Sequence, residues 1–202
     1  MAAPLSVNKW APGTSYGPVL TQTDLYLLNP DLEIHPILQQ KFGAFRLVLN
    51  ISTGQSQDGE GRGVEFTAKD EPAVLPRVDQ LYIISDHSPW CTTVRNERGV
   101  TLSDVCTAIW KEYTENFVTD GEMASLSARG QEQVKRAAQA HQAQQSGQWG
   151  YAHHAVGAVR CRRVDWFKDR IFFEGMRKED RYAQSRLGFK APNIFIMDLT
   201  NF

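Results

Sequence analysis

The chain has 202 residues, a length that suits one good-sized domain and leaves little room for two. Hydrophobic residues make up 42% of it, which is enough for a packed core and too much for a largely disordered chain. The net charge of −1 argues against a protein that coats nucleic acid or an anionic membrane along its whole surface. No apolar run resembles a signal peptide or a membrane span, so we expect a soluble, cytoplasmic domain.

The three cysteines, Cys91, Cys106 and Cys161, are widely spaced and odd in number. They form no CxxC pair and have no histidine at the spacing of a zinc ligand, which argues against a structural zinc site. We therefore predict reduced, mostly buried thiols in an intracellular setting, and neither a metal nor a cofactor.

The first 30 residues are rich in Pro, Gly, Ser and Thr, and their aromatic residues, such as Trp10 and Tyr16, are isolated. This composition predicts an extended arm or loose tail over 1–30, ahead of a single domain over 31–202. The first convincing strand is FRLVLNIS, Phe45 to Ser52. The polar, Gly-rich segment at 53–63 then predicts a mobile surface loop, and it lacks the Gly-Lys-Ser/Thr ending of a phosphate-binding loop.

Two short strands follow, around Tyr82–Ser85 and over Trp90–Arg95, separated by the turn residues DHSP. The clearest helix begins after Thr101, whose side chain can cap the first turn, with Asp104 three residues later. Apolar residues then recur at helical spacing and predict one broad buried face: Leu102, Val105, Cys106, Ile109, Trp110, Tyr113 and Phe117.

The sequence TDGE at 119–122 repeats the capping pattern and opens a short helical segment. Ser127 introduces a third helix, which we expect to fade into a long Gln/Ala/Gly/His loop over 140–157. The last strand is predicted over Asn193–Leu199. Strands, then about three helices, then a strand again favour an α+β fold, with a small sheet packed against the helices in one compact domain.

Histidine is the only side chain that titrates near neutral pH unaided, so the five histidines are candidates for acid–base chemistry. His35 and His87 fall in predicted turns, and His141 falls at the end of the third helix. His153 and His154 are adjacent in the predicted long loop, and no metal-ligand spacing accompanies them. No serine or cysteine has a recognisable nucleophile context, so the enzyme hypothesis is limited to His153 or His154 acting with Asp165 and an arginine.

The segment VRCRRVDWFKDR, 159–170, alternates apolar and cationic residues and opens a region, 160–190, with ten Lys/Arg against five Asp/Glu. In a strand, Arg160 and Arg162 share one face and Arg163 lies on the other. Asp165 could pair with Arg163 or cap a following turn, and Trp166 could anchor that turn in the core. The structural interpretation is a half-buried edge of the core. The functional alternative is an anion-recognition surface built from Arg160, Arg162 and Arg163, with Trp166 beside them.

Several stretches resemble a family of uncharacterised proteins from basidiomycete fungi, catalogued as a domain of unknown function, six-six-nine-nine. They are LNPDLEIHPIL at 28–38, FRLVLNIS, WCTTVRNERGVTLSDVCTAIW at 90–110, TDGEMASL, RRVDWF and FEGM. Within them, Val100–Val105 match a helix start, and an Arg-x-Asp element and an aromatic-x-Gly segment are matched by Arg163, Asp165, Phe173 and Gly175. The sequence departs from the family at 53–63 and 139–156. The resemblance implies a single compact α+β domain of fungal type, and no activity or cofactor.

We therefore expect a binding or interaction module whose basic face takes a small anionic ligand or an acidic protein segment. The alternative is the enzyme with a loop histidine. Nucleic acid is a weaker partner because no DNA- or RNA-binding motif accompanies the basic region. A deep pocket that holds a histidine and a carboxylate in hydrogen-bond reach would favour the enzyme, and a shallow basic face would favour the binding module.

Overall fold

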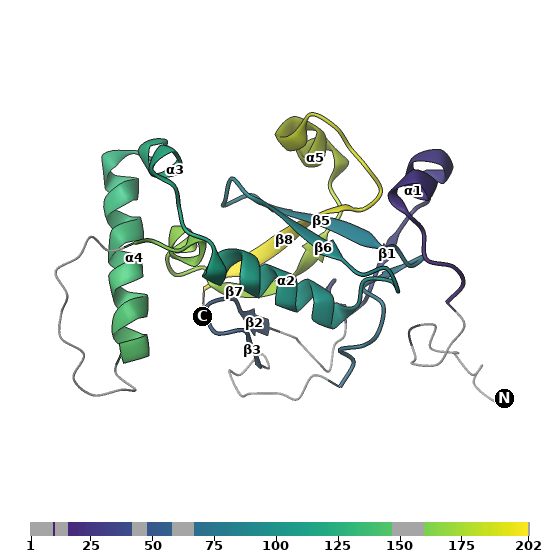
Figure 1. Ribbon diagram of the computed structural model, residues 1–202, viewed down its shortest axis with the longest axis horizontal. Helices are drawn as coiled ribbons and strands as arrows, with labels where there is room; N and C mark the ends of the chain where they lie inside the picture. Colours follow the sequence, from purple (N-terminus) through teal and green to yellow (C-terminus); the bar gives the residue numbers. More distant parts are fainter. Residues whose placement is uncertain (1–9, 11–15, 42–47, 58–66, 147–159, 202) are drawn as a thin grey trace.

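The computed structural model describes residues 10, 16–41, 48–57, 67–146 and 160–201. Six strands form one sheet in the order β3-β2-β7-β8-β5-β6, and all neighbours are antiparallel except β5 and β8 (Figure 1). The strands are β2 (Val48–Asn50), β3 (Gln55–Gln57), β5 (Gln80–Ser85), β6 (Cys91–Arg95), β7 (Phe172–Arg177) and β8 (Ile194–Thr200). A separate two-stranded sheet pairs β1 (Glu33–Ile34) with β4 (Val74–Leu75). The mixed helix and strand content confirms the α+β prediction.

Helices cover the two faces of the six-stranded sheet, as alternate residues of β8 show. Phe195 and Met197 belong to the main core, which includes the buried side of α2 (Leu102–Glu115). Ile194 and Ile196 point the other way and pack with Ala183 of α5 (Asp180–Leu187). This division follows from the two-residue period of a strand, and it makes β8 a central strand that is buried on both sides.

Helix α2 begins where the sequence predicts. The Thr101 hydroxyl accepts a hydrogen bond from the Asp104 amide at 3.2 Å, and the Asp104 carboxylate accepts one from the Thr101 amide at 2.9 Å. Ile109 is fully buried, as predicted, but Trp110 is only half-buried and lies on the flank of the buried face. The prediction that Phe117 is a core residue is wrong, since it lies beyond the end of the helix and is 37% exposed.

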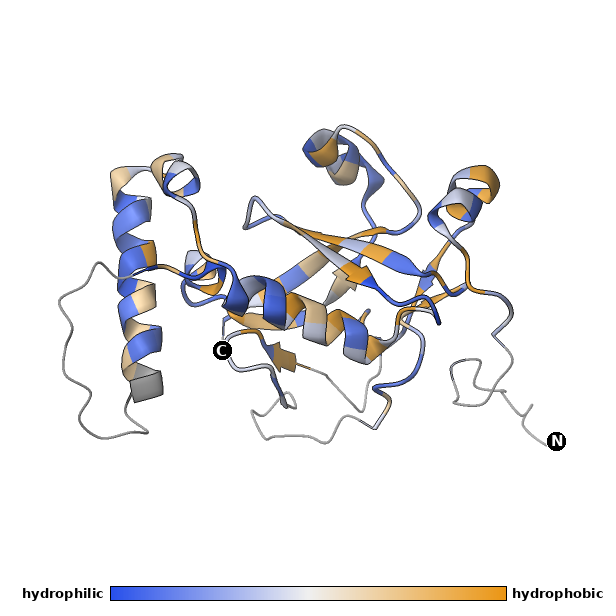
Figure 2. Ribbon diagram, viewed as in Figure 1, coloured by the Kyte–Doolittle hydropathy of each residue, from blue (hydrophilic) through white to orange (hydrophobic). Residues whose placement is uncertain are grey.

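The chain then forms α3 (Asp120–Ala124), with the predicted capping box at Thr119, and α4 (Ala128–Ser146). The loop predicted from residue 140 is wrong over its first part, because the helix continues to Ser146. Ala and Gln, which dominate this stretch, are good helix formers even without a strong apolar pattern. Figure 2 shows α4 as mostly hydrophilic, and only a narrow stripe that includes Val134 and Ala138 packs, against Cys161.

Residues near the N-terminus also depart from the prediction. Over Gln22–Leu28 the chain forms α1 where we expect an extended arm, because Thr21 and Asp24 make a capping box and Leu25 is fully buried. Likewise, Gln55–Gln57 forms strand β3 inside the predicted loop, after a turn at Gly54 with a φ of +74°. The remainder of that loop, 58–66, lies outside the described residues.

The basic segment is extended up to Arg162 and then turns into the 3-10 helix η1 (Arg163–Phe167). Its extended part runs antiparallel to the chain that leaves α2. The Val118 amide donates to the Cys161 carbonyl at 2.9 Å, and the Arg163 amide donates to the Asn116 carbonyl at 3.0 Å. Cys161 is buried and Arg160 and Arg162 are exposed, so the two arginines face outward together, as the strand alternation predicts.

Candidate functional site

Asp165 is the buried centre of this region, with only 3% of its surface exposed. One carboxylate oxygen accepts the Arg162 amide at 2.7 Å and so caps η1. The other oxygen lies 2.6 Å from Nδ1 of His141, on α4. An ionised carboxylate only accepts, so Nδ1 carries the hydrogen and the opposite ring nitrogen, Nε2, is left for another contact.

The predicted pairing of Arg163 with Asp165 is wrong. The Arg163 side chain instead forms an ion pair with Glu112 of α2, and its guanidinium lies over the Trp90 ring, 4.7 Å from the centroid. These contacts hold η1 against α2 and against Trp90, the residue before β6, and they give Arg163 a structural role. Trp166 has a structural role too. Its indole nitrogen donates to the His87 carbonyl at 3.0 Å, and its ring meets that of Trp90 edge-to-face at 5.2 Å.

Arg160 and Arg162 are in a different position. Arg160 stacks over the exposed Phe117 ring, 4.0 Å from its centroid. Within the described part of the chain, no carboxylate lies within ion-pair distance of either guanidinium. Both side chains line one small cavity of about 50 Å³, together with His141, Asp165 and Ser52. We call this cavity and its lining side chains the arginine site.

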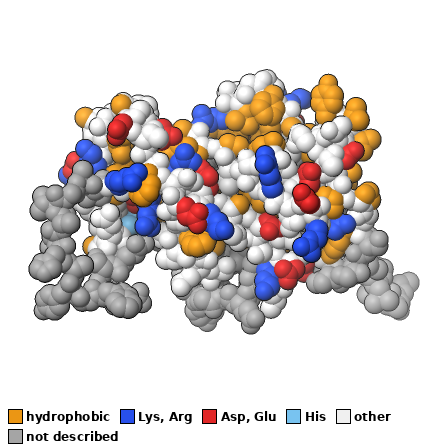
Figure 3. Space-filling model, viewed as in Figure 1, with side chains coloured by type: hydrophobic (Ala, Val, Ile, Leu, Met, Phe, Trp, Pro, Cys, Tyr) orange, Lys and Arg blue, Asp and Glu red, His pale blue; other side chains and the backbone are white. Residues whose placement is uncertain are grey.

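The arginine site opens into a wider groove of about 570 Å³, and the two share Ser52 and Arg162. Trp110, Thr114 and Phe117 line the groove, so its walls come from the outer side of α2 and the chain that leaves it. Figure 3 shows cationic side chains gathered where α4 meets the rest of the domain, beside a hydrophobic side chain and next to a hollow in the surface. A small cavity lined by cationic side chains at the end of a partly aromatic groove is a common form of ligand site.

His141 is the histidine that sequence reasoning did not select. The signal was present, because Val134, Ala138 and His141 follow one another at spacings of four and three, which places them on one face of a continuous helix. Ending the helix near residue 140 hid that relationship. His153 and His154, the predicted loop histidines, lie outside the described residues. Their role with Asp165 therefore stays a prediction.

The excess of cations over 160–190 does not make a single basic face. The region runs through η1, β7 and α5, and part of its charge is paired with carboxylates. Arg177 pairs with Asp86 and Asp198, and Lys178 lies 3.4 Å from Asp180. Arg170 lies 2.8 Å from Nε2 of His87, whose pKa is lowered by burial and by the nearby Arg170 charge. Arg160 and Arg162 have no carboxylate partner among the described residues, and they share a cavity with His141. Lys168 and Arg170 also lack an ion pair with a carboxylate there, but the pocket that they line with His87 contains the carboxylates of Asp86 and Asp169.

Comparison with known proteins assigns the chain to a family. The model of a family of unknown function, DUF6699, matches residues 44–185. The chain belongs to this family. The matched range contains every residue of the arginine site, whereas the LNPDLEIHPIL stretch lies before it. No curated protein and no solved structure shows a significant match to the chain.

Neither a membrane-spanning helix nor a metal-binding cluster occurs among the described residues. No helix among them is long and apolar enough to cross a membrane. Within the same residues, no cluster of three or more His, Cys, Asp or Glu side chains could hold a metal ion. The arginine site of this DUF6699 domain combines guanidinium, imidazole, carboxylate and hydroxyl groups.

Proposed function

We propose that this DUF6699 domain is a binding module that takes a small ligand by its anionic group, a phosphate or a carboxylate, at the arginine site. The observation that carries the proposal is the pair of outward guanidinium groups of Arg160 and Arg162, which have no carboxylate partner among the described residues and converge on one cavity with His141. Guanidinium groups match carboxylate and phosphate oxygens in geometry as well as in charge.

The surroundings of the cavity are arranged in advance for such a ligand. The Phe117 ring supports the Arg160 guanidinium at 4.0 Å, which limits the conformations that binding must freeze. Asp165 fixes the imidazole of His141 through Nδ1, and Asp165 itself is held by the Arg162 amide.

The size of the cavity favours a small ligand over an acidic protein segment. About 50 Å³ admits one anionic group. The wider groove beside it is lined by Trp110, Phe117 and the Glu115 carboxylate, and it suits a part of the same molecule that carries no negative charge. An acidic segment would need a row of unpaired cations, whereas Arg163, Arg177 and Lys178 of this region already have carboxylate partners.

The second candidate is an enzyme, and one observation favours it. A buried carboxylate that orients an imidazole is the arrangement that makes histidine a general base, and the Ser52 hydroxyl lines the same cavity. Against it, the Ser52 hydroxyl donates to the Asn50 side chain at 2.7 Å and is not bonded to His141. The enzyme hypothesis therefore moves from the loop histidines to His141, and it stays second to binding.

The proposal places the module in the cytoplasm of a fungal cell. Support for the compartment comes from the three cysteines, which are all thiols, with Cys106 and Cys161 buried and Cys91 exposed. Support for the fungal source comes from the sequence motifs that resemble proteins of basidiomycetes.

Isothermal titration of inorganic phosphate and acetate into the protein at low ionic strength tests the binding. The double variant R160Q/R162Q should weaken phosphate binding at least about tenfold, since two charge-assisted contacts are lost. The matched control is R98Q/R181Q, which removes the same charge from two exposed arginines outside the cavity. An equal loss of phosphate affinity in both variants would mean that the net charge of the protein, and not the arginine site, determines binding. No binding of either anion to the wild type would contradict the proposal, and tight binding of poly-glutamate alone would move it to an acidic segment.

A further inference from the structure

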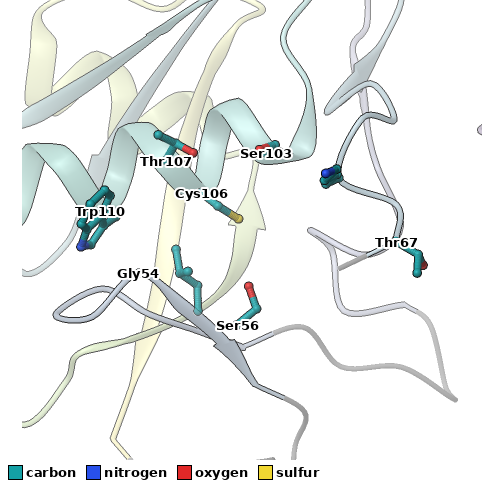
Figure 4. A pocket seen from close by; sticks show the side chains of 9 residues that line it. Gly54, Ser56, Thr67, Ser103, Cys106, Thr107 and Trp110 are labelled. Atoms are coloured by element: carbon teal, nitrogen blue, oxygen red, sulfur yellow. The ribbon is translucent and has the colours of Figure 1, made fainter. Parts of the chain in front are cut away.

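A second pocket, of about 560 Å³, lies between α2 and the β2–β3 hairpin, and Trp110 borders both this pocket and the groove of the arginine site. Figure 4 shows Ser103, Cys106, Thr107 and Trp110 of α2 on one side of it and Gly54 and Ser56 of the hairpin on the other. The turn at Gly54 closes against the indole of Trp110, since a Cβ built on Gly54 would lie 3.1 Å from the ring. The contact separates the two hollows. We call the second one the hydroxyl pocket.

Several polar side chains line the hydroxyl pocket. Four hydroxyls (Ser56, Thr67, Ser103 and Thr107) and the ammonium of Lys69 line it. Within the described residues, none of these five side chains makes a hydrogen bond or an ion pair. Such a concentration of unused donors and acceptors at one concave surface favours a ligand that can engage several of them at once.

The hydroxyls of the neighbouring groove provide a contrast on the same elements. The Thr114 hydroxyl, on α2 two turns after Thr107, donates to the Trp110 carbonyl at 2.8 Å. Ser52, at the start of the hairpin turn, donates to Asn50. Ser and Thr side chains often bond locally in this way. Those that face the hydroxyl pocket do not, so their donors and acceptors stay available for a ligand.

The charged side chains that line the hydroxyl pocket indicate which ligands it can bind. Among the described residues, Lys69 is the one charged residue that lines it, and no carboxylate does. Cys106 also faces it, but burial raises the pKa of this thiol to about 12, so the sulfur is neither an anion nor a nucleophile near neutral pH. The pocket therefore combines one positive charge, several neutral hydroxyls and one aromatic edge.

We propose that the hydroxyl pocket binds a polyhydroxylated ligand of monosaccharide size that carries one anionic group, such as a sugar phosphate. Lys69 neutralises the anionic group, and Ser103, Thr107 and Ser56 exchange hydrogen bonds with the ligand hydroxyls, as neutral hydroxyls of both partners are at once donors and acceptors. This site is separate from the arginine site and does not depend on the anion binding proposed there.

Isothermal titration with glucose 6-phosphate, glucose and inorganic phosphate as probes tests this inference. The wild type should bind glucose 6-phosphate more tightly than either of the others, because only it uses both the charge and the hydroxyls. S103A/T107V, which removes two hydroxyls and leaves similar shapes, should weaken binding at least about tenfold. K69M should weaken binding of glucose 6-phosphate and leave glucose unchanged. T107S keeps a hydroxyl and should bind like the wild type.

The control is T93V/S185A, which removes two exposed hydroxyls from β6 and α5, outside the pocket. Thermal unfolding of each variant shows whether it is folded before it is titrated. The inference is wrong if glucose 6-phosphate does not bind, or binds no more tightly than inorganic phosphate. It is also wrong if binding is lost in R160Q/R162Q and kept in S103A/T107V and K69M, because the sugar phosphate would then occupy the arginine site. That last result would support the anion binding proposed above.

Discussion

The carboxylate of Asp165 lies 2.6 Å from Nδ1 of His141, which is 24 residues earlier in the sequence. This contact joins the 3-10 helix η1 to α4. The same carboxylate caps η1 through the Arg162 amide. One buried side chain thus fixes both the path of the arginine segment and the orientation of the imidazole beside it. The geometry of the arginine site depends on this contact more than on any other.

Replacing Asp165 with Ala should lower the free energy of unfolding by roughly 2–4 kcal/mol, because it leaves the Arg162 amide and the His141 ring without their buried acceptor. Urea denaturation of D165A and of the wild type measures the difference. H141Q is the companion variant and should cost less, since the cap on η1 survives. A D165A protein as stable as the wild type would show that the contact does not hold this region together.

The three neighbouring arginines should differ sharply in their effect on stability. R163Q loses both the Glu112 ion pair and the contact with the Trp90 ring, and we expect a loss of about 1–3 kcal/mol. R160Q/R162Q replaces two exposed side chains and should change stability by less than about 0.5 kcal/mol per site. Thermal unfolding of the two variants shows which of these arginines stabilise the fold and which only lie on the surface. Equal destabilisation would mean that Arg160 and Arg162 also support the fold.

Stability should depend on pH through His35, which is 1% exposed. Its Nδ1 accepts the Ile37 amide at 3.1 Å, and its Nε2 lies 2.8 Å from the Glu71 carboxylate. Burial lowers the pKa of His35, although Glu71 opposes the shift. The unfolded chain therefore binds a proton at higher pH than the folded protein does, starting near about 6.5.

Because the unfolded state binds more protons in this window, the His35 contribution is lost as the pH falls below about 6.5 towards the lowered folded value. Urea denaturation at pH 7.5 and pH 5 should show a larger decrease in the wild type than in H35Q, which has no ring to protonate. The same decrease in both proteins would mean that His35 does not carry the effect.

The turn at Gly54 should be intolerant of a side chain for two reasons, a φ of +74° and the Trp110 ring at 3.1 Å. Gly188 is a matched control, since its φ is +81° and a Cβ there would meet nothing within 4 Å. G188A should cost about 1 kcal/mol from the backbone alone, and G54A should cost more. G54A/W110A should recover part of the excess. If G54A and G188A lose the same stability, the hairpin can move away from the Trp110 ring, and this ring does not fix the position of the turn.

Local patterns in the sequence were enough to predict much of the scaffold. The capping residues around Thr101 and Thr119, the apolar spacing of α2 and the alternation over Asn193–Leu199 are short-range signals that packing did not override. Arg160 and Arg162 were placed outward for the same reason. The capping box at Thr21 has the same form, but the Pro-, Gly-, Ser- and Thr-rich composition around it led to the prediction of an extended arm.

Long-range partners could not be predicted in this way. Arg163 selects Glu112, 51 residues away, over Asp165, two residues away, because the turn of η1 directs the two side chains apart. The spacing of Trp110 along α2 is that of a core residue. In the structure, however, its ring contacts the turn at Gly54 and lines both the hydroxyl pocket and the groove of the arginine site. His141 becomes a partner of Asp165 only because α4 continues past residue 140.

The anion-binding proposal is tested most directly at His141, by NMR of imidazole signals in ¹⁵N-labelled protein as inorganic phosphate is added. H141Q assigns the His141 resonances. We predict that they shift and saturate with the phosphate concentration in the wild type and in R98Q/R181Q, and that they stay unchanged in R160Q/R162Q. If phosphate binds while the His141 resonances do not move, or if they move equally in R160Q/R162Q, the anion does not lie between these arginines and the imidazole.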